Sequence, residues 1–309
     1  MQTRRKWLLR FLGLVGVLVL TGLVFWHFWI SHPMGSGPAG PKVPNEPFNT
    51  TWNSRPVLLV GIGDSVTAGF GARKGYSYFD RLVQNPPDEW PDMRGISLSR
   101  AFPNLTFTNL AVSGSTSLEH EARQIPHLPR TDTNTLAIVV MTTGGNDLIH
   151  SYGRMPPKEG AMFGAAWEQA RPWITNFESR LERSLDEITH AFPGGCHIFL
   201  ANIYDPTDGT GDARSVGLPL WPDAMRIHGA YNEVIKRCVN RRKHVHLVNL
   251  HESFLGHGLT NQQFWRPNYR RADPHYWYFV NLEDPNERGY DAIRRLFLNE
   301  MVKVKDQLN

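Results

Sequence analysis

Cysteine is almost absent from this chain, with two in 309 residues, Cys196 and Cys238. That count excludes a disulfide-dense scaffold and a cysteine-rich zinc module. An excess of charge is also missing from most of the chain. Residues 1–30 hold four basic residues and no acidic ones, so 29 of the 33 lysines and arginines remain beyond residue 30, against 29 aspartates and glutamates. The body is therefore formally neutral, and no nucleic-acid partner is expected.

Motifs for cofactors and metals are incomplete. No Walker A sequence occurs, and Val66 stands where a dinucleotide fingerprint would need its third glycine. Thr67 likewise interrupts the Gly-x-Ser-x-Gly elbow of α/β-hydrolases, and the two His-Glu pairs lack the second histidine of a zinc protease. We expect neither a cofactor nor a metal.

One long uncharged run lies near the N-terminus, from Phe11 to Trp29. Its 19 residues would span about 28 Å as a helix, close to the thickness of a bilayer core. Aromatic residues crowd its far end, as in an interfacial belt, and four basic residues precede it. The pattern predicts a single-pass helix with the N-terminus in the cytoplasm and the body outside, in the periplasm or on the cell surface.

A cleaved signal peptide is the alternative interpretation of this run. It would need a shorter apolar region and a small-residue cleavage site, whereas the run ends in bulky aromatics and His32-Pro33. We favour an uncleaved anchor. The expected organisation is a basic tail at 1–10, a transmembrane signal anchor at 11–30, a Pro/Gly-rich linker at 31–54 and one domain at 55–309.

From residue 55 onward, short β-branched runs alternate with longer helical patterns. The expected strands are Val57–Ile62, Leu105–Leu110, Leu136–Met141, His197–Ile203 and Val245–Leu250. The expected helices lie near Tyr76–Val83, Leu118–Gln124, Ala161–Ala191, Asp223–Asn240 and Asn286–Asp306. This alternation predicts an α/β fold with a parallel sheet and helices on both faces.

Polar residues follow three of these strands. Ser65 comes after the first strand, Gly114 after the second and Asn146 after the third. Because the carboxyl ends of parallel strands share one edge of a sheet, we expect these residues to meet there. The Ser65 hydroxyl can attack a carbonyl carbon, and an Asn amide with backbone N–H groups can stabilise the resulting oxyanion. The set predicts acyl transfer.

In the sequence blocks around these residues, the chain resembles the SGNH/GDSL hydrolases, a family of serine esterases and lipases with a flavodoxin-like sheet. The resemblance rests on Gly63-Asp64-Ser65, the Gly114 segment and Gly144-x-Asn146-Asp147, in that order, and spans most of residues 56–300. It implies an ester substrate, a lipid or an acylated carbohydrate, with Ser65 as the nucleophile and the Ser65 and Gly114 N–H groups and the Asn146 amide as the oxyanion hole.

The last block departs from the family pattern Asp-x-x-His-Pro-Asn-x-x-Gly-Tyr. Here Asn281 stands in place of the aspartate, and Asp284 in place of the histidine that serves as general base. Three alternatives remain open. His275 can swing in as the base, held by Asp273 or Asp284. Asp284 can act directly if burial raises its pKa. Otherwise the protein is a non-catalytic surface module that binds a ligand in the same cleft.

Three further features carry expectations. His257, a second candidate base, lies in a Gly-His-Gly setting typical of a structural loop. The aromatic-rich segment 264–279 is either a lid or sugar platform, or a loop packed on the last helix. Cys196 precedes the strand at His197–Ile203 and Cys238 lies near the end of the following helix, so both are expected away from the active edge. They form either a disulfide or two unrelated buried thiols.

Overall fold

A five-stranded parallel sheet forms the centre of the protein in a computed structural model, which describes residues 2–308. Its order is β2-β1-β3-β4-β5. The strands are β1 (Val57–Ile62), β2 (Leu105–Asn109), β3 (Leu136–Met141), β4 (Cys196–Ala201) and β5 (Val245–Val248). All neighbouring strands are parallel. From β1 the chain adds β2 on one side and then β3, β4 and β5 on the other, which is the doubly wound, flavodoxin-like arrangement. The predicted fold class is confirmed.

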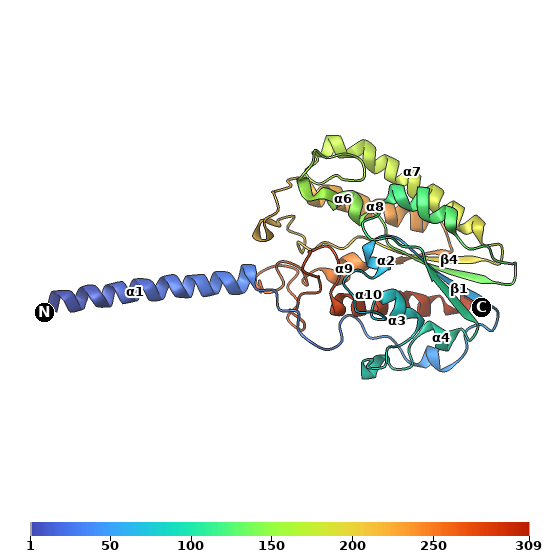
Figure 1. Ribbon diagram of the computed structural model, residues 1–309, viewed down its shortest axis with the longest axis horizontal. Helices are drawn as coiled ribbons and strands as arrows, with labels where there is room; N and C mark the ends of the chain where they lie inside the picture. Colours follow the sequence, from blue (N-terminus) through green and yellow to red (C-terminus); the bar gives the residue numbers. More distant parts are fainter. Residues whose placement is uncertain (1, 309) are drawn as a thin grey trace.

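Helices cover both faces of this sheet (Figure 1). Alternate strand side chains enter opposite layers, with Val57 and Leu59 in one apolar cluster and Leu58 and Val60 in the other. The first layer holds α3 (Tyr78–Val83), α4 (Leu98–Ala101) and α10 (Glu287–Lys303), and the second holds α7 (Trp167–Ala191) and α8 (Ala224–Asn240). Short helices follow the strand ends: α2 (Ser65–Ala68), α5 (Ser117–Glu119), α6 (Gly145–Ile149) and α9 (Leu250–Phe254).

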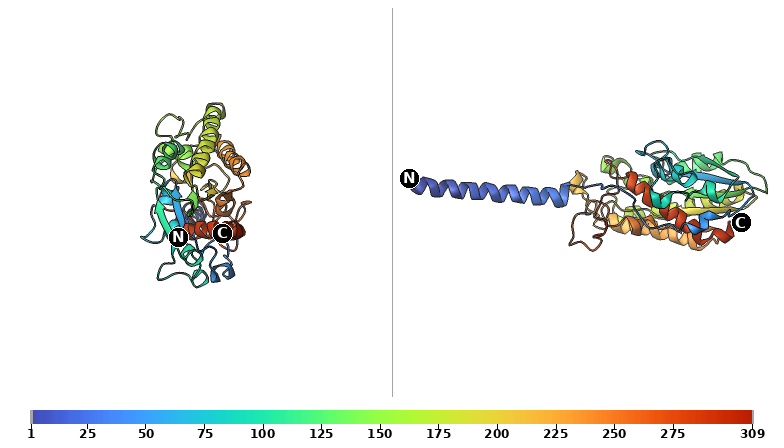
Figure 2. Two further views of the ribbon diagram at one scale, coloured as in Figure 1. Left: turned by 90° about the vertical axis from the view of Figure 1, so that its right-hand side faces the viewer. Right: turned by 90° about the horizontal axis from the view of Figure 1, so that it is seen from below.

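The N-terminal helix α1 (Gln2–Phe25) projects from the body and continues into a π-helical turn, η1 (Trp26–Ile30) (Figures 1 and 2). Between residues 4 and 30 it is long and apolar enough to cross a membrane, and this stretch is not buried inside the protein. A signal sequence near an N-terminus has the same length and composition.

Residues 31–54 differ from the expected linker because they pack along the body. Phe48 and Trp52 are buried in the layer that contains α10. The Ala39 N–H donates to the Asp291 carboxylate of α10 over 3.0 Å. Gly40 has φ 89°, and an added Cβ there would stand 2.7 Å from the Ala292 Cα. Gly40 therefore allows the backbone to approach α10 closely.

Cys196 and Cys238 are both buried and free, so the disulfide alternative is wrong and the two are separate buried thiols. Both belong to the same apolar cluster, as the strand–helix geometry required. The Cys238 thiol, however, hydrogen bonds to Glu182 of α7. The packing of α8 against α7 thus turns this thiol toward the neighbouring helix, and burial together with Glu182 raises its pKa to about 12.

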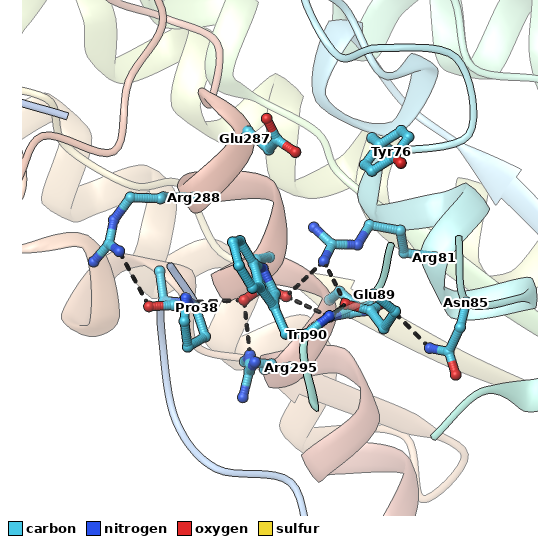
Figure 3. A network of polar contacts seen from close by, with 12 residues as sticks. Pro38, Tyr76, Arg81, Asn85, Glu89, Trp90, Glu287, Arg288 and Arg295 are labelled. Carbon is cyan, nitrogen blue, oxygen red and sulfur yellow. Dashed lines mark hydrogen bonds and ion pairs between the residues drawn. The ribbon is translucent and has the colours of Figure 1, made fainter. Parts of the chain in front are cut away.

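A buried ion-pair network joins α3, the loop after it and α10 (Figure 3). Glu89, only 3% exposed, accepts from Arg81 over 2.8 Å and also from Arg294. Asp291 in turn pairs with Arg294 and, over 3.0 Å, with Arg295. Burial alone would raise the pKa of Glu89, but the two arginines lower it to about 2. The network fixes α10, and with it the loop that precedes α10.

Replacing Glu89 with glutamine is expected to lower the free energy of unfolding by about 3–5 kcal/mol, because Asp291 is then the one carboxylate left to the buried Arg81 and Arg294 side chains in this network. Urea denaturation of the detergent-solubilised protein measures this. Glu287→Gln is the matched control, since the Glu287–Arg73 pair is exposed and should contribute no measurable stability. The Glu89 contribution should be complete above its ordinary pKa of 4.5 and decline as pH falls toward 2. Equal effects of the two substitutions would contradict this assignment.

Candidate active site

Ser65 begins α2 at the carboxyl end of β1. Asp64 caps that helix, accepting from the Val66 N–H over 3.1 Å and from the Thr142 hydroxyl over 2.8 Å. Gly63, at φ 144°, brings β1 close to β3, because an added Cβ would stand 2.5 Å from the Thr142 carbonyl oxygen. Burial raises the pKa of Asp64 to about 6, although the hydrogen bonds from Thr142 and Val66 act to lower it. The turn therefore holds the Ser65 hydroxyl at a fixed point on the sheet edge.

The segments that follow β2 and β3 are joined to this turn by hydrogen bonds. The Ser115 hydroxyl donates to the Gly63 carbonyl over 2.9 Å, and the Asn146 amide donates to the Ser115 carbonyl over 2.9 Å. Gly114, at φ 82°, precedes Ser115. Within residues 2–308, no group accepts a hydrogen bond from the backbone N–H of Ser65 or Gly114. The structure thus ties all three predicted segments together and leaves these N–H groups available to a ligand.

Asp284 lies beside Ser65, in the position of the missing histidine. The carboxyl is 2% exposed, and burial raises its pKa, while hydrogen bonding to Ser65 and Asn281 opposes the rise. The Asn281 amide donates to Asp284 Oδ2 over 2.6 Å, and the Asp284 N–H returns a bond to the Asn281 side chain over 3.2 Å. Asp284 Oδ1 is buried and forms no hydrogen bond of good geometry among residues 2–308. One oxygen of this carboxylate is therefore engaged by Asn281, and the carboxylate interacts with the Ser65 side chain.

The backbone between Asn281 and Asp284 is strained. Leu282 has φ 71°, a left-handed conformation that a leucine rarely adopts. Its side chain is nonetheless buried and lines the cavity at Ser65. The reciprocal Asn281–Asp284 bonds hold this conformation, so the loop is shaped to present Asp284.

The structure does not bring His275 to Ser65. The His275 Nδ1 pairs with Asp273 over 2.6 Å, and the ring lies against Gly35 in the segment that follows α1. Arg288 holds the second oxygen of Asp273 over 2.5 Å, so this histidine belongs to the contact between residues 31–54 and α10. His257 is stacked on Trp277 at 3.5 Å between ring centroids, which agrees with a structural role.

A cavity of about 130 Å³ opens beside Ser65 and Asn146. Its walls are largely apolar, formed among others by Leu148, Ile149, Phe163, Ile203, Leu218 and Trp221. Several polar residues in its lining were not indicated by the sequence, among them Glu283 and His228. His228 Nε2 bonds the Ile203 carbonyl over 3.0 Å, while its buried Nδ1 has no partner within residues 2–308. Neither lies in a recognisable motif, since α8 and the 281–284 loop meet only in the folded chain.

No group of three or more His, Cys, Asp or Glu side chains suited to a metal ion occurs among residues 2–308. What the geometry assembles is a hydroxyl, free backbone N–H groups, an amide and a buried carboxylate beside an apolar cavity. A doubly wound parallel sheet with this set at its carboxyl edge is the arrangement that the sequence predicts for acyl transfer.

The comparison with family models agrees. Residues 62–292 match the model of the GDSL-like Lipase/Acylhydrolase family, and the chain belongs to that family. A search of curated protein sequences gives no match.

Solved structures of similar fold include the extracellular lipase of Streptomyces rimosus, at 18% identity and a TM-score of 0.51, covering 79% of this chain and 98% of that one. A variant of an acetyl xylan esterase from Geobacillus stearothermophilus has 18% identity and a TM-score of 0.49, covering 81% and 95%. The phospholipase A1 of Streptomyces albidoflavus has 17% identity and a TM-score of 0.47, covering 80% and 99%. At these identities the likeness concerns the fold.

Proposed function

We propose that this protein hydrolyses carboxylic esters, acyl or acetyl, with Ser65 as nucleophile and Asp284 as the general base that acts on it directly. The observation that carries the proposal is the buried carboxylate of Asp284, which interacts with the Ser65 side chain and is held by Asn281. A carboxylate is a weak base in water, but burial raises its pKa toward the range in which it can accept a hydroxyl proton.

The reaction follows from these positions. Ser65 Oγ attacks the ester carbonyl carbon as its proton passes to Asp284, and the carbonyl oxygen becomes an oxyanion. The Ser65 and Gly114 N–H groups and the Asn146 amide donate to that oxyanion. Collapse of the tetrahedral intermediate expels the alkoxide, which takes the proton from Asp284. Water then attacks the acyl-enzyme in the same way and releases the acid and free Ser65.

We also propose that α1 is an uncleaved anchor and that the body works outside the cytoplasm. The four basic residues before the apolar run support this orientation, and the contacts between η1 and the body support retention of the helix. The substrates are then esters of lipids or of acylated carbohydrates at the cell envelope. These are also the kinds of molecule named for the similar acetyl xylan esterase and phospholipase structures.

A fluorophosphonate probe tests the proposal. Such probes bond only to an activated serine, so labelling of the full-length protein, lost in Ser65→Ala, is the expected result. Hydrolysis of 4-nitrophenyl acetate should be blocked in proportion to labelling. An unlabelled Ser65 in a protein that shows ligand binding but no hydrolysis would indicate a non-catalytic binding module instead.

Asn146→Ala is expected to lower kcat by roughly a hundredfold while leaving KM within a few-fold. The Asn146 amide has two N–H groups, and the Ser115 carbonyl occupies only one of them. The second is free for the oxyanion, which forms only in the transition state. Steady-state kinetics on 4-nitrophenyl acetate separate the two constants. Full activity in this variant would contradict the oxyanion assignment.

Asn281→Ala is expected to move the acid limb of kcat/KM to higher pH. The Asn281 amide stabilises the charged form of Asp284, so its loss raises further a pKa that burial already raises. The base must be deprotonated to act, and activity at a given low pH therefore falls more than activity at high pH. A uniform loss at every pH would show that Asn281 only shapes the loop.

A further inference from the structure

The end of the N-terminal helix is docked on the body directly. The Phe28 and Trp29 rings of η1 lie 4.8 and 5.7 Å from the Trp265 ring, between centroids. The Gln263 side-chain amide also donates to the Phe28 carbonyl over 3.0 Å. The helix is therefore joined to the body by direct packing contacts and not by a flexible tether. If α1 spans a bilayer, these contacts hold the 263–265 loop at the membrane surface.

The same helix end touches the wall of the cavity. The turn η7 (Arg214–Val216) contacts η1, and the residues on either side of it, Ala213 and Leu218, line the cavity at Ser65. In Figure 1, the short helices α2, α6 and α9 that follow strand ends lie on the side of the sheet nearer α1. The cavity is thus walled by a segment that itself borders the membrane end of the molecule.

Large apolar side chains on these two loops are exposed. Val216 and Leu220 are 43% and 55% exposed, and Phe264 and Trp265 are 64% and 47% exposed. Val216 and Leu220 lie beside the segment that forms the cavity wall. Phe264 and Trp265 lie against the end of the N-terminal helix. Aromatic and aliphatic side chains in this arrangement are typical of segments that enter the interfacial region of a bilayer.

We propose that Val216, Leu220, Phe264 and Trp265 form a membrane-contact surface that lies in the outer leaflet of the bilayer spanned by α1, and that the cavity takes its acyl ester from that leaflet. The substrate is then a membrane-resident amphiphile with a long acyl chain, which the apolar cavity wall accommodates. This inference rests on the proposed ester hydrolysis and anchoring, and adds where the substrate comes from.

Paired substrates test the surface in the full-length protein, reconstituted at one chain per lipid nanodisc. The first is 4-methylumbelliferyl oleate dissolved in the nanodisc, and the second is 4-nitrophenyl acetate in water. The double variant Leu220→Ser/Phe264→Ser should lose at least tenfold in rate on the oleate ester and stay within twofold on the acetate. Phe107→Ser is the matched control, because Phe107 is 56% exposed on the edge strand β2, and both rates should be unchanged.

Equal losses on both substrates, or no loss on either, would overturn the proposal. A second measurement does not depend on catalysis. A nitroxide label at Leu220→Cys should be relaxed more by oxygen than by a water-soluble nickel complex, and a label at Phe107→Cys should show the reverse. Cys196 and Cys238 are buried, and the unsubstituted chain gives their background. If the unaltered protein hydrolyses neither ester, the proposed function fails, while the label at position 220 still decides the membrane contact.

Discussion

Ser65→Ala is expected to abolish ester hydrolysis, with a fall in kcat of about 10⁴-fold or more, and to leave thermal stability nearly unchanged. The hydroxyl supplies the bond-forming oxygen, which no neighbouring group replaces. Its removal costs little stability because the cap of α2 comes from Asp64, not from Ser65. Kinetics on 4-nitrophenyl acetate and a thermal melt measure the two effects.

Ser113→Ala is the control for this prediction, since Ser113 is an exposed serine on the loop before Gly114. It should retain activity and labelling by the fluorophosphonate. Residual hydrolysis by Ser65→Ala at more than a few per cent would mean that another group carries the acyl transfer.

Asp284→Asn is expected to lower kcat by about a thousandfold or more, while His275→Ala leaves it within a few-fold. Asparagine keeps the size of the side chain and the contact with Asn281 but cannot accept a proton. The His275 ring is engaged by Asp273 and Gly35, away from the cavity lining. The pH profile adds a second readout: because burial raises the pKa of Asp284, the acid limb should lie above the ordinary carboxyl value of 3.8.

His228→Ala tests the remaining imidazole in the cavity lining. Its buried Nδ1 has no partner within residues 2–308 and can in principle accept a proton. We expect a moderate effect on KM, from lost contact with substrate. An inactive His228→Ala together with an active Asp284→Asn would transfer the role of base to the histidine. Asp64 and Glu283 also have raised pKa values, mainly from burial, so the assignment depends on these variants and not on the pH profile alone.

Much of the fold follows from local pattern. The strands at Val57–Ile62 and Leu136–Met141 lie where their continuous apolar runs predicted them, because a strand buried on both faces needs such a run. Helix α7 begins at Trp167 instead of Ala161, since Ala161 is engaged in an isolated bridge with Lys158 and Ala166 has extended backbone angles. Parallel pairing then places the residues after β1 and β3 at one edge, and the structure indeed puts Ser65 and Asn146 on one cavity.

The sequence by itself thus determined the parallel sheet, the exposed apolar helix and the gathering of the strand-end residues, because periodicity and strand direction are local properties. Only the tertiary structure decided what stands beside Ser65. Residues 31–54 pack along α10, and Gly35 of this segment lies against the His275 ring. Arg288 of α10 holds Asp273, the partner of His275. The strained 281–284 loop instead presents Asp284. The packing of α8 on α7 likewise decided that the two cysteines stay free. Each outcome depends on contacts between segments distant in the chain, whose free energies no local pattern encodes.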